Sequence, residues 1–318
     1  MADFLSYRIP GTSIIELRGS FLPVDQLEEM DGFVVSNFEG TKFFGFDPTA
    51  TSKGDSIVES VNPYVIDEND YLNQANKFIS AFESSSLQKA ILSRIKKVST
   101  DISPNELFHR LTIKYPNAFC YCIQSENFGT WVGATPEQLM KWENGNGETI
   151  ALAGTKATTD FLAWGEKEQQ EQQLVANYIS EKIHLFSTEV KMEERKEFVA
   201  GPVKHLVTNF QFRCEAEKRF KLVKEMHPTP AVSGFPVREA IDLIHSTEQH
   251  QRDLYAGIIG VTSSNATNLF VNLRCCQFIG TDAYLYVGGG LTKDSIPENE
   301  WIETENKALT LLNVLQNK

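Results

Sequence analysis

Two pairs of glutamates, each spaced three residues apart, are the side chains of this sequence best suited to act together. Glu168 and Glu171 fall in one predicted helix, and Glu300 and Glu303 fall in another. Residues three positions apart share a helix face, so each pair turns two carboxylates to the same side. Mg²⁺ prefers hard oxygen ligands and typically takes one or two carboxylates, several waters and oxygens of the substrate. The spacing therefore favours a magnesium site, whereas either pair alone also fits an ordinary solvated acidic face.

The second glutamate pair follows a run of glycines in the segment YVGGGLTKDSIPENEWIETENKALTLLNVL, residues 286–315. A backbone without Cβ atoms turns sharply and approaches a ligand closely, so Gly288–Gly290 predict a glycine loop. Ser295 as N-cap and Pro297 in the first turn predict where the following helix begins. Lys307 lies on the same helical stripe as the two glutamates. Two carboxylates and an amine are thus expected beside a glycine loop.

Four further residues have side chains that could act in a buried site. Lys89 opens a predicted strand at residues 88–98, where a lysine usually extends to solvent, and a partly desolvated lysine is the functional alternative. Glu137 is expected where a strand emerges into a turn. His205 lies in the middle of a predicted strand, a position more typical of a hydrogen-bonded structural histidine. Arg274 is expected inside an otherwise apolar strand, where an unpaired guanidinium would be very costly.

Composition and charge limit the classes of protein to which the chain can belong. Its 318 residues, 41% of them hydrophobic, are enough for one large domain or two ordinary ones. A net charge of −12 argues against nucleic acid and anionic membranes as partners. The five cysteines lack metal-ligand spacing, and two of them are adjacent, which favours reduced buried thiols. Because no signal peptide or transmembrane run is recognisable, we expect a soluble, cytoplasmic protein.

Strands with interspersed helices must position these residues. Residues 1–75 alternate in the manner of strands, and we expect a strand-rich scaffold integral to one domain with residues 76–318. A predicted strand, ETIALAGTKA, includes Gly154 and Thr155, whose backbone N–H groups are available to an anion. Helices are predicted at residues 102–113 and 166–182. The dominance of strands and the absence of repeats predict an α+β fold built on antiparallel sheet.

An ordered series of motifs identifies the family that the chain resembles. In order, these are KAILSR, GATPEQL, ALAGT, KEQQEQQLV, HLVT, HPTPAVSGFP, DLYAGIIG, NLRCC and VGGGLTKDSIPENEWIETENKALTLL. Over residues 80–318 the chain resembles the chorismate-binding enzymes, which include isochorismate, salicylate, anthranilate and aminodeoxychorismate synthases. The resemblance implies the chorismate-utilising fold, with large antiparallel β-sheets in a sandwich-like core and flanking helices. It makes residues 76–318 the chorismate-binding catalytic region.

The resemblance also assigns the acidic residues and the catalytic pair. By similarity to the family, Glu171 and Glu303 are direct Mg²⁺ ligands. Glu168 and Glu300 reach the metal through water molecules. Glu137 resembles the general acid that protonates the departing 4-hydroxyl of chorismate. Lys89 resembles the general base that activates a water for attack at C2.

The remaining motif residues resemble the family's substrate site. The metal and the backbone of Gly154 and Thr155 would hold the ring carboxylate, and His205 would lie beside the ring. Arg274 and Tyr255 resemble the pair that grips the enolpyruvyl carboxylate. The resemblance completes the anion site with Gly288, Gly289, Gly290 and Lys307.

Two positions indicate the nucleophile. Family members that use ammonia carry Gln where this chain has Lys89, and the aminodeoxychorismate branch carries Lys where this chain has Ala153. Both positions therefore favour water. The segment HPTPAVSG resembles the isochorismate synthases, whereas Tyr255 resembles the salicylate synthases. Gln172 departs from the family pattern, which has His after the metal-binding glutamate.

These features predict a Mg²⁺-dependent isochorismate synthase, an isomerase that serves menaquinone or siderophore biosynthesis. One alternative is a salicylate synthase, which forms isochorismate and then eliminates pyruvate. An inactive chorismate-fold binding or regulatory protein is the alternative of another class, and the joint presence of Lys89, Glu137, Glu171 and Glu303 argues against it. We expect chorismate as the small-molecule substrate, with no nucleic acid, membrane or obligate partner subunit, and a monomer.

Overall fold

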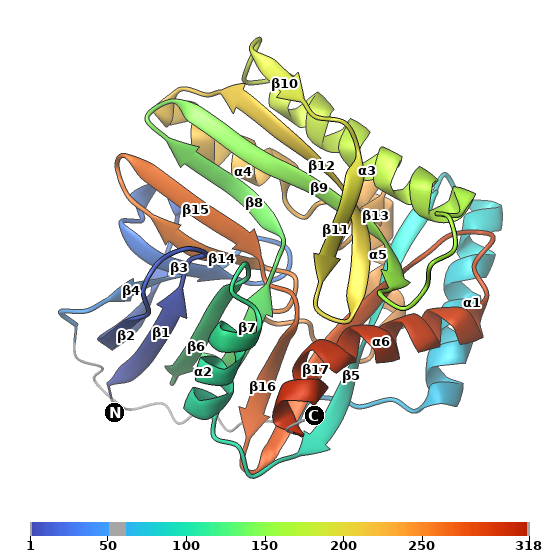
Figure 1. Ribbon diagram of the computed structural model, residues 1–318, viewed down its shortest axis with the longest axis horizontal. Coiled ribbons are helices and arrows are strands. Elements are labelled where there is room, and N and C mark those ends of the chain that lie inside the picture. Colours follow the sequence, from blue (N-terminus) through green and yellow to red (C-terminus); the bar gives the residue numbers. More distant parts are fainter. Residues whose placement is uncertain (1, 51–61, 317–318) are drawn as a thin grey trace.

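Two antiparallel β-sheets share one strand and form the body of the protein (Figure 1). The computed structural model describes residues 2–50 and 62–316. The first sheet has the order β2 (Ile15–Val24), β1 (Asp3–Arg8), β6 (Phe119–Ser125), β7 (Gly129–Thr135), β16 (Cys275–Ile279), β17 (Asp282–Leu291), β5 (Lys89–Ser99) and β13 (Gly234–Phe235).

The second sheet starts from the same strand β2. Its order is β2, β4 (Phe43–Asp47), β3 (Gly32–Ser36), β14 (Ile258–Thr262), β15 (Ala266–Val271), β8 (Gln138–Glu143), β9 (Asn146–Ala157) and β12 (Val203–Arg213), with β10 (Val190–Met192) and β11 (Lys196–Ala200) beside β12. Every strand pair within the described residues is antiparallel, so the α+β fold on antiparallel sheet is confirmed.

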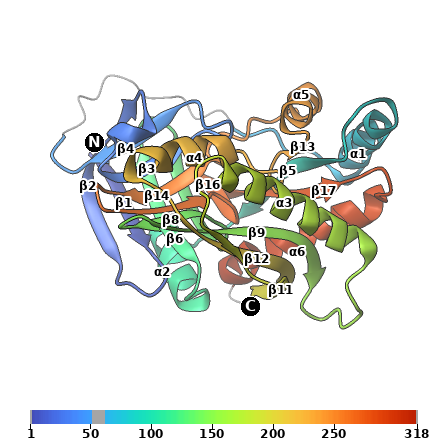
Figure 2. The ribbon, with the colours of Figure 1, turned by 90° about the horizontal axis from the view of Figure 1, so that it is seen from above.

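Six helices flank the sheets within the described ranges (Figure 2). They are α1 (Glu68–Ser84), α2 (Pro104–Lys114), α3 (Glu166–His184), α4 (Arg219–Met226), α5 (Val237–Thr247) and α6 (Pro297–Leu315). Helices α1 and α5 lie together beside β5, while α6 packs along β17. None of the helices in the described part of the chain is both long enough and apolar enough to span a membrane.

Strand β6 shows how the alternation of side chains builds two cores. Phe119, Tyr121 and Ile123 join the larger core, which takes residues from both sheets. Cys120 and Cys122 point to the other face and join a second core beneath α2 and α6. Because successive side chains of a strand point to opposite faces, one strand serves both cores. All five cysteines are free and buried, as their sequence pattern predicts.

Side chains cap two of the helix starts, Asp67 at α1 and Ser103 at α2. The side chain of Ser103 accepts a hydrogen bond from the Glu106 amide at the start of α2. The predicted N-cap of α6, Ser295, is wrong, because the helix begins one residue later and Ile296 occupies the N-cap position. The Ser295 hydroxyl instead accepts a hydrogen bond from the amide of Thr292 at 3.0 Å, which shapes the turn before the helix.

Two other expectations about local structure are wrong. Gly288–Gly290 are not a loop, because they lie within β17 and pair with β5. Arg274 is not inside a strand, because it separates β15 from β16 with a φ of 50°. Both segments line the cavity described below.

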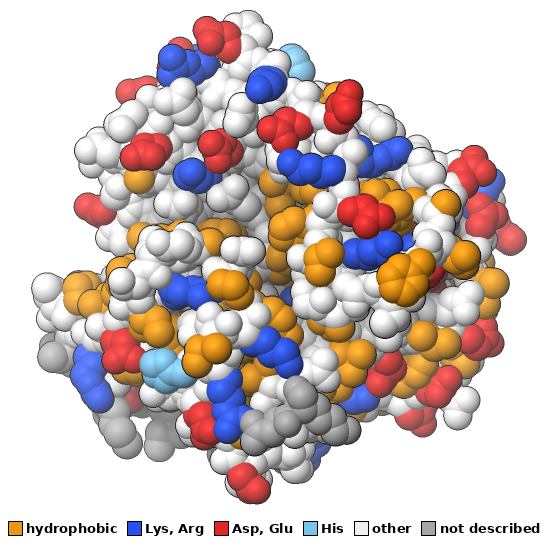
Figure 3. Space-filling model, viewed as in Figure 1, with side chains coloured by type: hydrophobic (Ala, Val, Ile, Leu, Met, Phe, Trp, Pro, Cys, Tyr) orange, Lys and Arg blue, Asp and Glu red, His pale blue; other side chains and the backbone are white. Residues whose placement is uncertain are grey.

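Acidic and basic side chains are interspersed across the face of the molecule shown in Figure 3. The formal net charge of −12 is therefore not gathered there into one acidic field.

Candidate active site

One cavity brings together most of the residues singled out from the sequence. Strands of both sheets, helices α3 and α6 and four connecting segments supply its walls. Of the predicted residues, its lining includes Lys89, Glu137, Gly154, Thr155, Glu171, His205, Tyr255, Arg274, Gly288, Gly290, Glu303 and Lys307. The predicted residues Gly289, Glu168 and Glu300 are not among the residues that line the cavity.

The three glycines of β17 provide room for the functional side chains. A Cβ atom on Gly290 would lie 2.7 Å from Cε of Lys89, and one on Gly288 would lie 2.9 Å from the Tyr255 hydroxyl. A Cβ on Gly289 would point to the other face, 3.5 Å from Oε1 of Glu303. The glycines were expected to allow a close approach, and they do so from a regular strand rather than from a loop.

Lys89 and Glu137 are buried ionisable groups of opposite type. Their exposed fractions are 3% and 5%, so the lysine does not extend to solvent as strand lysines usually do. Burial lowers the pKa of Lys89, although the carboxylate of Glu171 opposes the change. Burial raises the pKa of Glu137 to about 7, against the opposing effects of Lys89 and Lys307. A carboxyl group that keeps its proton near neutral pH can act as an acid, and an amine that loses its proton more easily can act as a base.

The raised pKa of Glu137 predicts a pH-dependent stability difference for Glu137→Gln. A carboxyl whose pKa rises from 4.5 to about 7 on folding destabilises the native state as pH increases through that interval, because it must ionise where it is buried. The cost reaches about 3 kcal/mol above pH 7. We therefore expect the glutamine variant to match wild type at pH 4.5 and to exceed it at pH 8, in urea unfolding with EDTA present. Equal differences at both pH values would contradict a raised pKa.

His205 joins the strand backbone to Arg274. Its Nδ1 lies 3.0 Å from the carbonyl oxygen of Gly154, and its Nε2 lies 3.2 Å from Nη2 of Arg274. Burial, followed by the charge of Arg274, holds the pKa of His205 well below its usual range, so the ring is neutral. A guanidinium only donates, so Nε2 accepts and Nδ1–H donates to Gly154. His205 is thus hydrogen-bonded to the backbone, as expected of a structural histidine in a strand, and it also lines the cavity.

Gly154 lies at an irregularity in the ladder between β9 and β12. Thr155 pairs with His205 and Ala153 pairs with Leu206, so Gly154 is the extra residue of a β-bulge. Its φ of +70° is a conformation that side-chain-bearing residues rarely adopt. The bulge breaks the regular pairing where the anion site was predicted.

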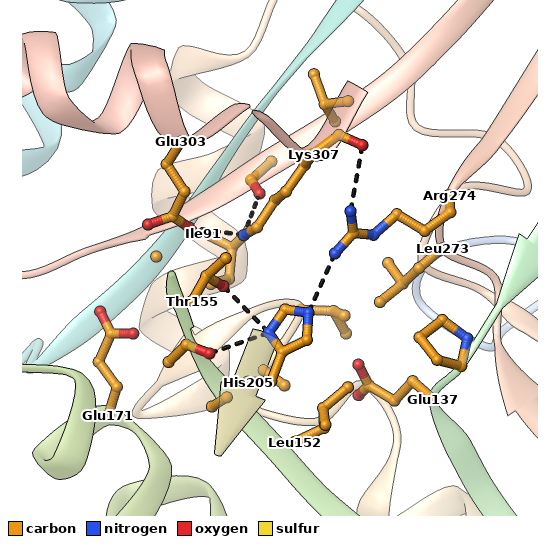
Figure 4. Close-up of a pocket in the computed structure, with 18 of the residues that line it drawn as sticks. Ile91, Glu137, Leu152, Thr155, Glu171, His205, Leu273, Arg274, Glu303 and Lys307 are labelled. Carbon is orange, nitrogen blue, oxygen red and sulfur yellow. Dashed lines mark hydrogen bonds and ion pairs between the residues drawn. The ribbon is translucent and has the colours of Figure 1, made fainter. Parts of the chain in front are cut away.

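Arg274 finds the partners that its burial requires. Its Nη1 donates to the carbonyl oxygen of Lys307 at 3.2 Å and to Oγ1 of Thr310 at 3.0 Å, and Nη2 reaches His205 (Figure 4). None of these partners is a carboxylate, so the guanidinium keeps its full positive charge toward the cavity. Lys307 adds a second cation, with Nζ 2.8 Å from the carbonyl oxygen of Gly288 and 2.7 Å from Oε1 of Glu303.

The acidic residues gather between helices α3 and α6. Figure 4 shows Glu171 and Glu303 on the side of the cavity away from Glu137. Burial, aided by the charges of Glu303 and Glu300, raises the pKa of Glu171 to about 7 against the opposing charges of Lys89 and Lys167. Buried oxygens of three of these carboxylates have no hydrogen-bond partner within the described chain: Oε2 of Glu168, Oε1 of Glu171 and Oε2 of Glu300.

These carboxylates fit a hard divalent cation in the chemistry of their donor atoms. Unpaired, mutually repelling carboxylate oxygens are what a bound Mg²⁺ would neutralise. Among the described residues no three acidic, histidine or cysteine side chains are close enough to hold an ion together. Two direct carboxylates, completed by water and substrate, are therefore the ligand set that these residues could supply.

Sequence reasoning missed Lys167 and several apolar residues of the cavity. Lys167 forms an ion pair with Glu300 across α3 and α6, and only its position beside Glu168 could have indicated this. Leu273 and Tyr286 line the cavity from apolar segments that carry no distinguishing pattern. Gln172, the departure from the family's histidine, points away from the acidic cluster and donates to Thr208 at 2.8 Å.

Comparisons with known proteins place the chain in a family. The family model described as "Chorismate binding enzyme" matches residues 47–316. Isochorismate synthase EntC of Escherichia coli K12 is 30% identical over 243 residues, and the match spans 72% of this chain but only 62% of EntC. Isochorismate synthase MenF of Bacillus subtilis is 26% identical over 322 residues, which cover 93% of this chain and 66% of MenF.

The fold agrees with a solved structure of the same group. The menaquinone-specific isochorismate synthase MenF from Escherichia coli superposes with a TM-score of 0.83 at 19% identity, covering 99% of this chain and 89% of that chain. The resemblance found in the motifs is thereby confirmed, as is the expected fold. The chain belongs to the family of chorismate-binding enzymes.

Proposed function

We propose that the protein is an isochorismate synthase, which converts chorismate to isochorismate by adding water at C2 and releasing the 4-hydroxyl group. One observation carries the proposal: a buried carboxyl with a pKa of about 7 and a buried lysine with a lowered pKa line the same cavity. The exchange of hydroxyl position needs one acid and one base, and these two groups can supply them.

Glu137 is proposed to act on the leaving group. Hydroxide leaves poorly, so a proton must reach the 4-oxygen as its bond to carbon breaks. Burial keeps Glu137 protonated to about pH 7, which gives it a transferable proton at neutral pH. The same carboxyl would be ionised and ineffective at its ordinary pKa.

Lys89 is proposed to act on the nucleophile. Water attacks carbon poorly unless a base takes its proton, and burial increases the neutral fraction of the lysine amine. The proton accepted by Lys89 and the proton given by Glu137 balance, so the reaction needs no external acid or base. Lys89 and Ala153 also stand where the ammonia-using and aminodeoxychorismate branches carry other residues, which favours water as nucleophile.

Arg274 and Lys307 are proposed to hold the anionic groups of the substrate. Chorismate has two carboxylates, and a chain with a net charge of −12 must offer local cations to bind them. Both cations line the cavity and are fixed by neighbouring backbone or side-chain groups. The β-bulge at Gly154 supplies a further backbone site for an anion.

We also propose that Glu171 and Glu303 hold a Mg²⁺ ion and that Glu168 and Glu300 reach it through water. When bound, the ion would orient the ring carboxylate and offset charge that develops during the reaction. The unpartnered carboxylate oxygens support this assignment. The isochorismate product would serve menaquinone or siderophore biosynthesis.

A salicylate synthase is the second candidate, and Tyr255 is the observation that favours it. The tyrosine lines the cavity, and only a glycine at position 288 leaves room for its hydroxyl. A hydrogen bond from that hydroxyl to the enolpyruvyl group would hold isochorismate in place for elimination of pyruvate. Ala231 and Val232, from the segment that resembles the isochorismate synthases, line the same cavity and favour release instead.

The product of chorismate distinguishes these candidates. We expect purified protein with Mg²⁺ to form isochorismate until it reaches equilibrium with chorismate, with salicylate as a slow trace. Chromatography measures isochorismate, and fluorescence measures salicylate. Conversion mainly to salicylate and pyruvate would establish the second candidate, and an unchanged chorismate pool would refute both.

A further inference from the structure

A buried ion pair lies behind the cavity and takes no direct part in its lining. The side chains of Glu248 and Arg252 are 2% and 3% exposed. Arg252 donates from Nη2 to Oε1 of Glu248 at 2.6 Å and from Nε to Oε2 at 2.9 Å. Both bonds of this two-point contact are charge-assisted, so the orientation of the guanidinium plane is fixed.

The side chains of Glu248 and Arg252 form hydrogen bonds with the part of β5 that has no neighbouring strand on this side. Strand β13 pairs with β5 only at Ala90 and Lys89 and then ends. Beyond that point, Nη2 of Arg252 donates to the carbonyl oxygen of Ile91 at 2.8 Å, and Oε1 of Glu248 accepts from the amide of Ser93 at 2.7 Å. One side chain donates and the other accepts, as a neighbouring strand would. Past the last backbone hydrogen bond, which the amide of Ile91 donates to the carbonyl oxygen of Ser233 at 3.0 Å, the edge of β5 is thus held by side chains.

Arg252 also connects two walls of the cavity. Its Nη1 donates to the carbonyl oxygen of Val232 at 2.8 Å, while Nη2 holds Ile91. Val232 and Ile91 both line the cavity, and Ile91 follows Lys89 by two residues in β5. The carbonyl oxygen of Arg252 accepts a hydrogen bond from the amide of Tyr255 at 2.8 Å. A single residue therefore sets the distance between the strand of Lys89, the turn at Val232 and the turn that carries Tyr255.

We propose that Arg252, oriented by Glu248, is a positioning residue that places Lys89 against the substrate pocket. Stability alone does not account for the pair, because replacing a buried ion pair by apolar groups is often neutral or stabilising. A rigid planar fork can hold two carbonyl oxygens at a set separation, which an ammonium group cannot do. The inference rests on the proposed function, because the experiment that tests it measures the turnover of chorismate.

Three variants separate positioning from stability. Arg252→Met leaves the buried Glu248 carboxylate without its arginine, with only His250 at 3.6 Å and the hydrogen bonds from Ser93 remaining, so both unfolding temperature and kcat should fall. The double variant Glu248→Gln with Arg252→Met removes both charges, and it should regain much of the unfolding temperature without regaining kcat. We expect kcat to stay reduced by about 10²-fold, the cost of misplacing a catalytic group by about 1 Å, with KM for chorismate little changed. Arg252→Lys keeps the charge but not the fork and should show the same loss of kcat.

Arg219 offers a matched control. It is also buried and also donates to two backbone carbonyl oxygens, those of Ser264 at 2.8 Å and Ser263 at 2.7 Å, but none of these residues lines the cavity. Arg219→Met should lower the unfolding temperature and leave kcat unchanged.

The outcomes have distinct meanings. Wild-type kcat in a folded Arg252→Lys variant, or in the double variant once its stability has returned, would overturn the inference. So would an equal loss of kcat in Arg219→Met. If the double variant does not fold, circular dichroism and kcat of Arg252→Lys below its unfolding temperature decide the matter. Wild-type protein that converts no chorismate to any product would instead refute the proposed function.

Discussion

Glu171→Gln and Glu303→Gln are each expected to abolish turnover of chorismate while the fold remains intact. Glutamine keeps the shape of the side chain and removes the charge that would hold Mg²⁺. A catalytic metal supplies several kcal/mol of transition-state stabilisation, so its loss corresponds to at least about 10³-fold in rate. Glu171→Gln should not lower stability, because burial and neighbouring carboxylates raise the pKa of Glu171 and oppose its ionisation. Glu303→Gln also removes the ion pair with Lys307, so a modest loss of stability is expected for that variant alone.

Initial rates and Mg²⁺ titrations by calorimetry check this expectation together. Glu298→Gln is the matched control, since Glu298 is exposed on the same helix as Glu303 and does not line the cavity. It should bind Mg²⁺ and turn over chorismate as wild type does. Near wild-type rates in EDTA, or unchanged Mg²⁺ binding in both variants, would show that these carboxylates have another role.

Lys89→Ala and Glu137→Gln should each lower kcat by about 10²–10⁴-fold, the usual cost of losing a positioned acid or base. The two losses have different origins. The alanine variant leaves water without a base, and the glutamine variant cannot protonate the leaving hydroxyl. Because the proposed roles place both groups at the reacting atoms, KM should change much less than kcat.

Lys97→Ala provides the comparison for the lysine. Lys97 lies on the same strand β5, but its side chain is 46% exposed and pairs with Asp282. Its removal should leave kcat unchanged. A near-normal kcat in Lys89→Ala would mean that the burial of this lysine serves the structure and not the chemistry.

Much of the fold could be predicted because local patterns and tertiary packing agree. The helix at 166–182 begins in the structure at Glu166 and ends two residues later than expected, and its apolar side is buried. The strand predicted at 88–98 is present within a residue of both ends, and the strand around His205 is present as Val203–Arg213. In each case the period of the apolar residues matches the element that forms.

The two wrong predictions of local structure concern segments that line the cavity. Consecutive glycines normally indicate a turn, but here the neighbouring side chains of Lys89 and Tyr255 need the space that a Cβ would take. Arg274 looked like a strand residue because apolar neighbours surround it, whereas its φ of 50° turns the side chain toward α6 and His205. Such constraints arise between segments far apart in the sequence, so no local window contains them.

The roles of Glu248 and Arg252 were missed for a related reason. Charged residues separated by an i, i+4 spacing usually indicate an exposed helix face. Here the two residues follow helix α5 and are buried against β5, more than 150 positions earlier in the chain. Only the three-dimensional structure shows that the side chains of Glu248 and Arg252 form the hydrogen bonds that a neighbouring strand would otherwise form with β5.

The pairing of β5 with β17 has a consequence for synthesis of the protein on the ribosome. Ala90 pairs with Leu291, so the strand that bears Lys89 waits for a partner made about 200 residues later. At usual elongation rates that delay is about 10–40 s. During this time an apolar strand edge is available to other nascent chains, which is the situation in which chaperones bind. The yield of folded protein should therefore depend on chaperone capacity and on translation speed downstream of β5.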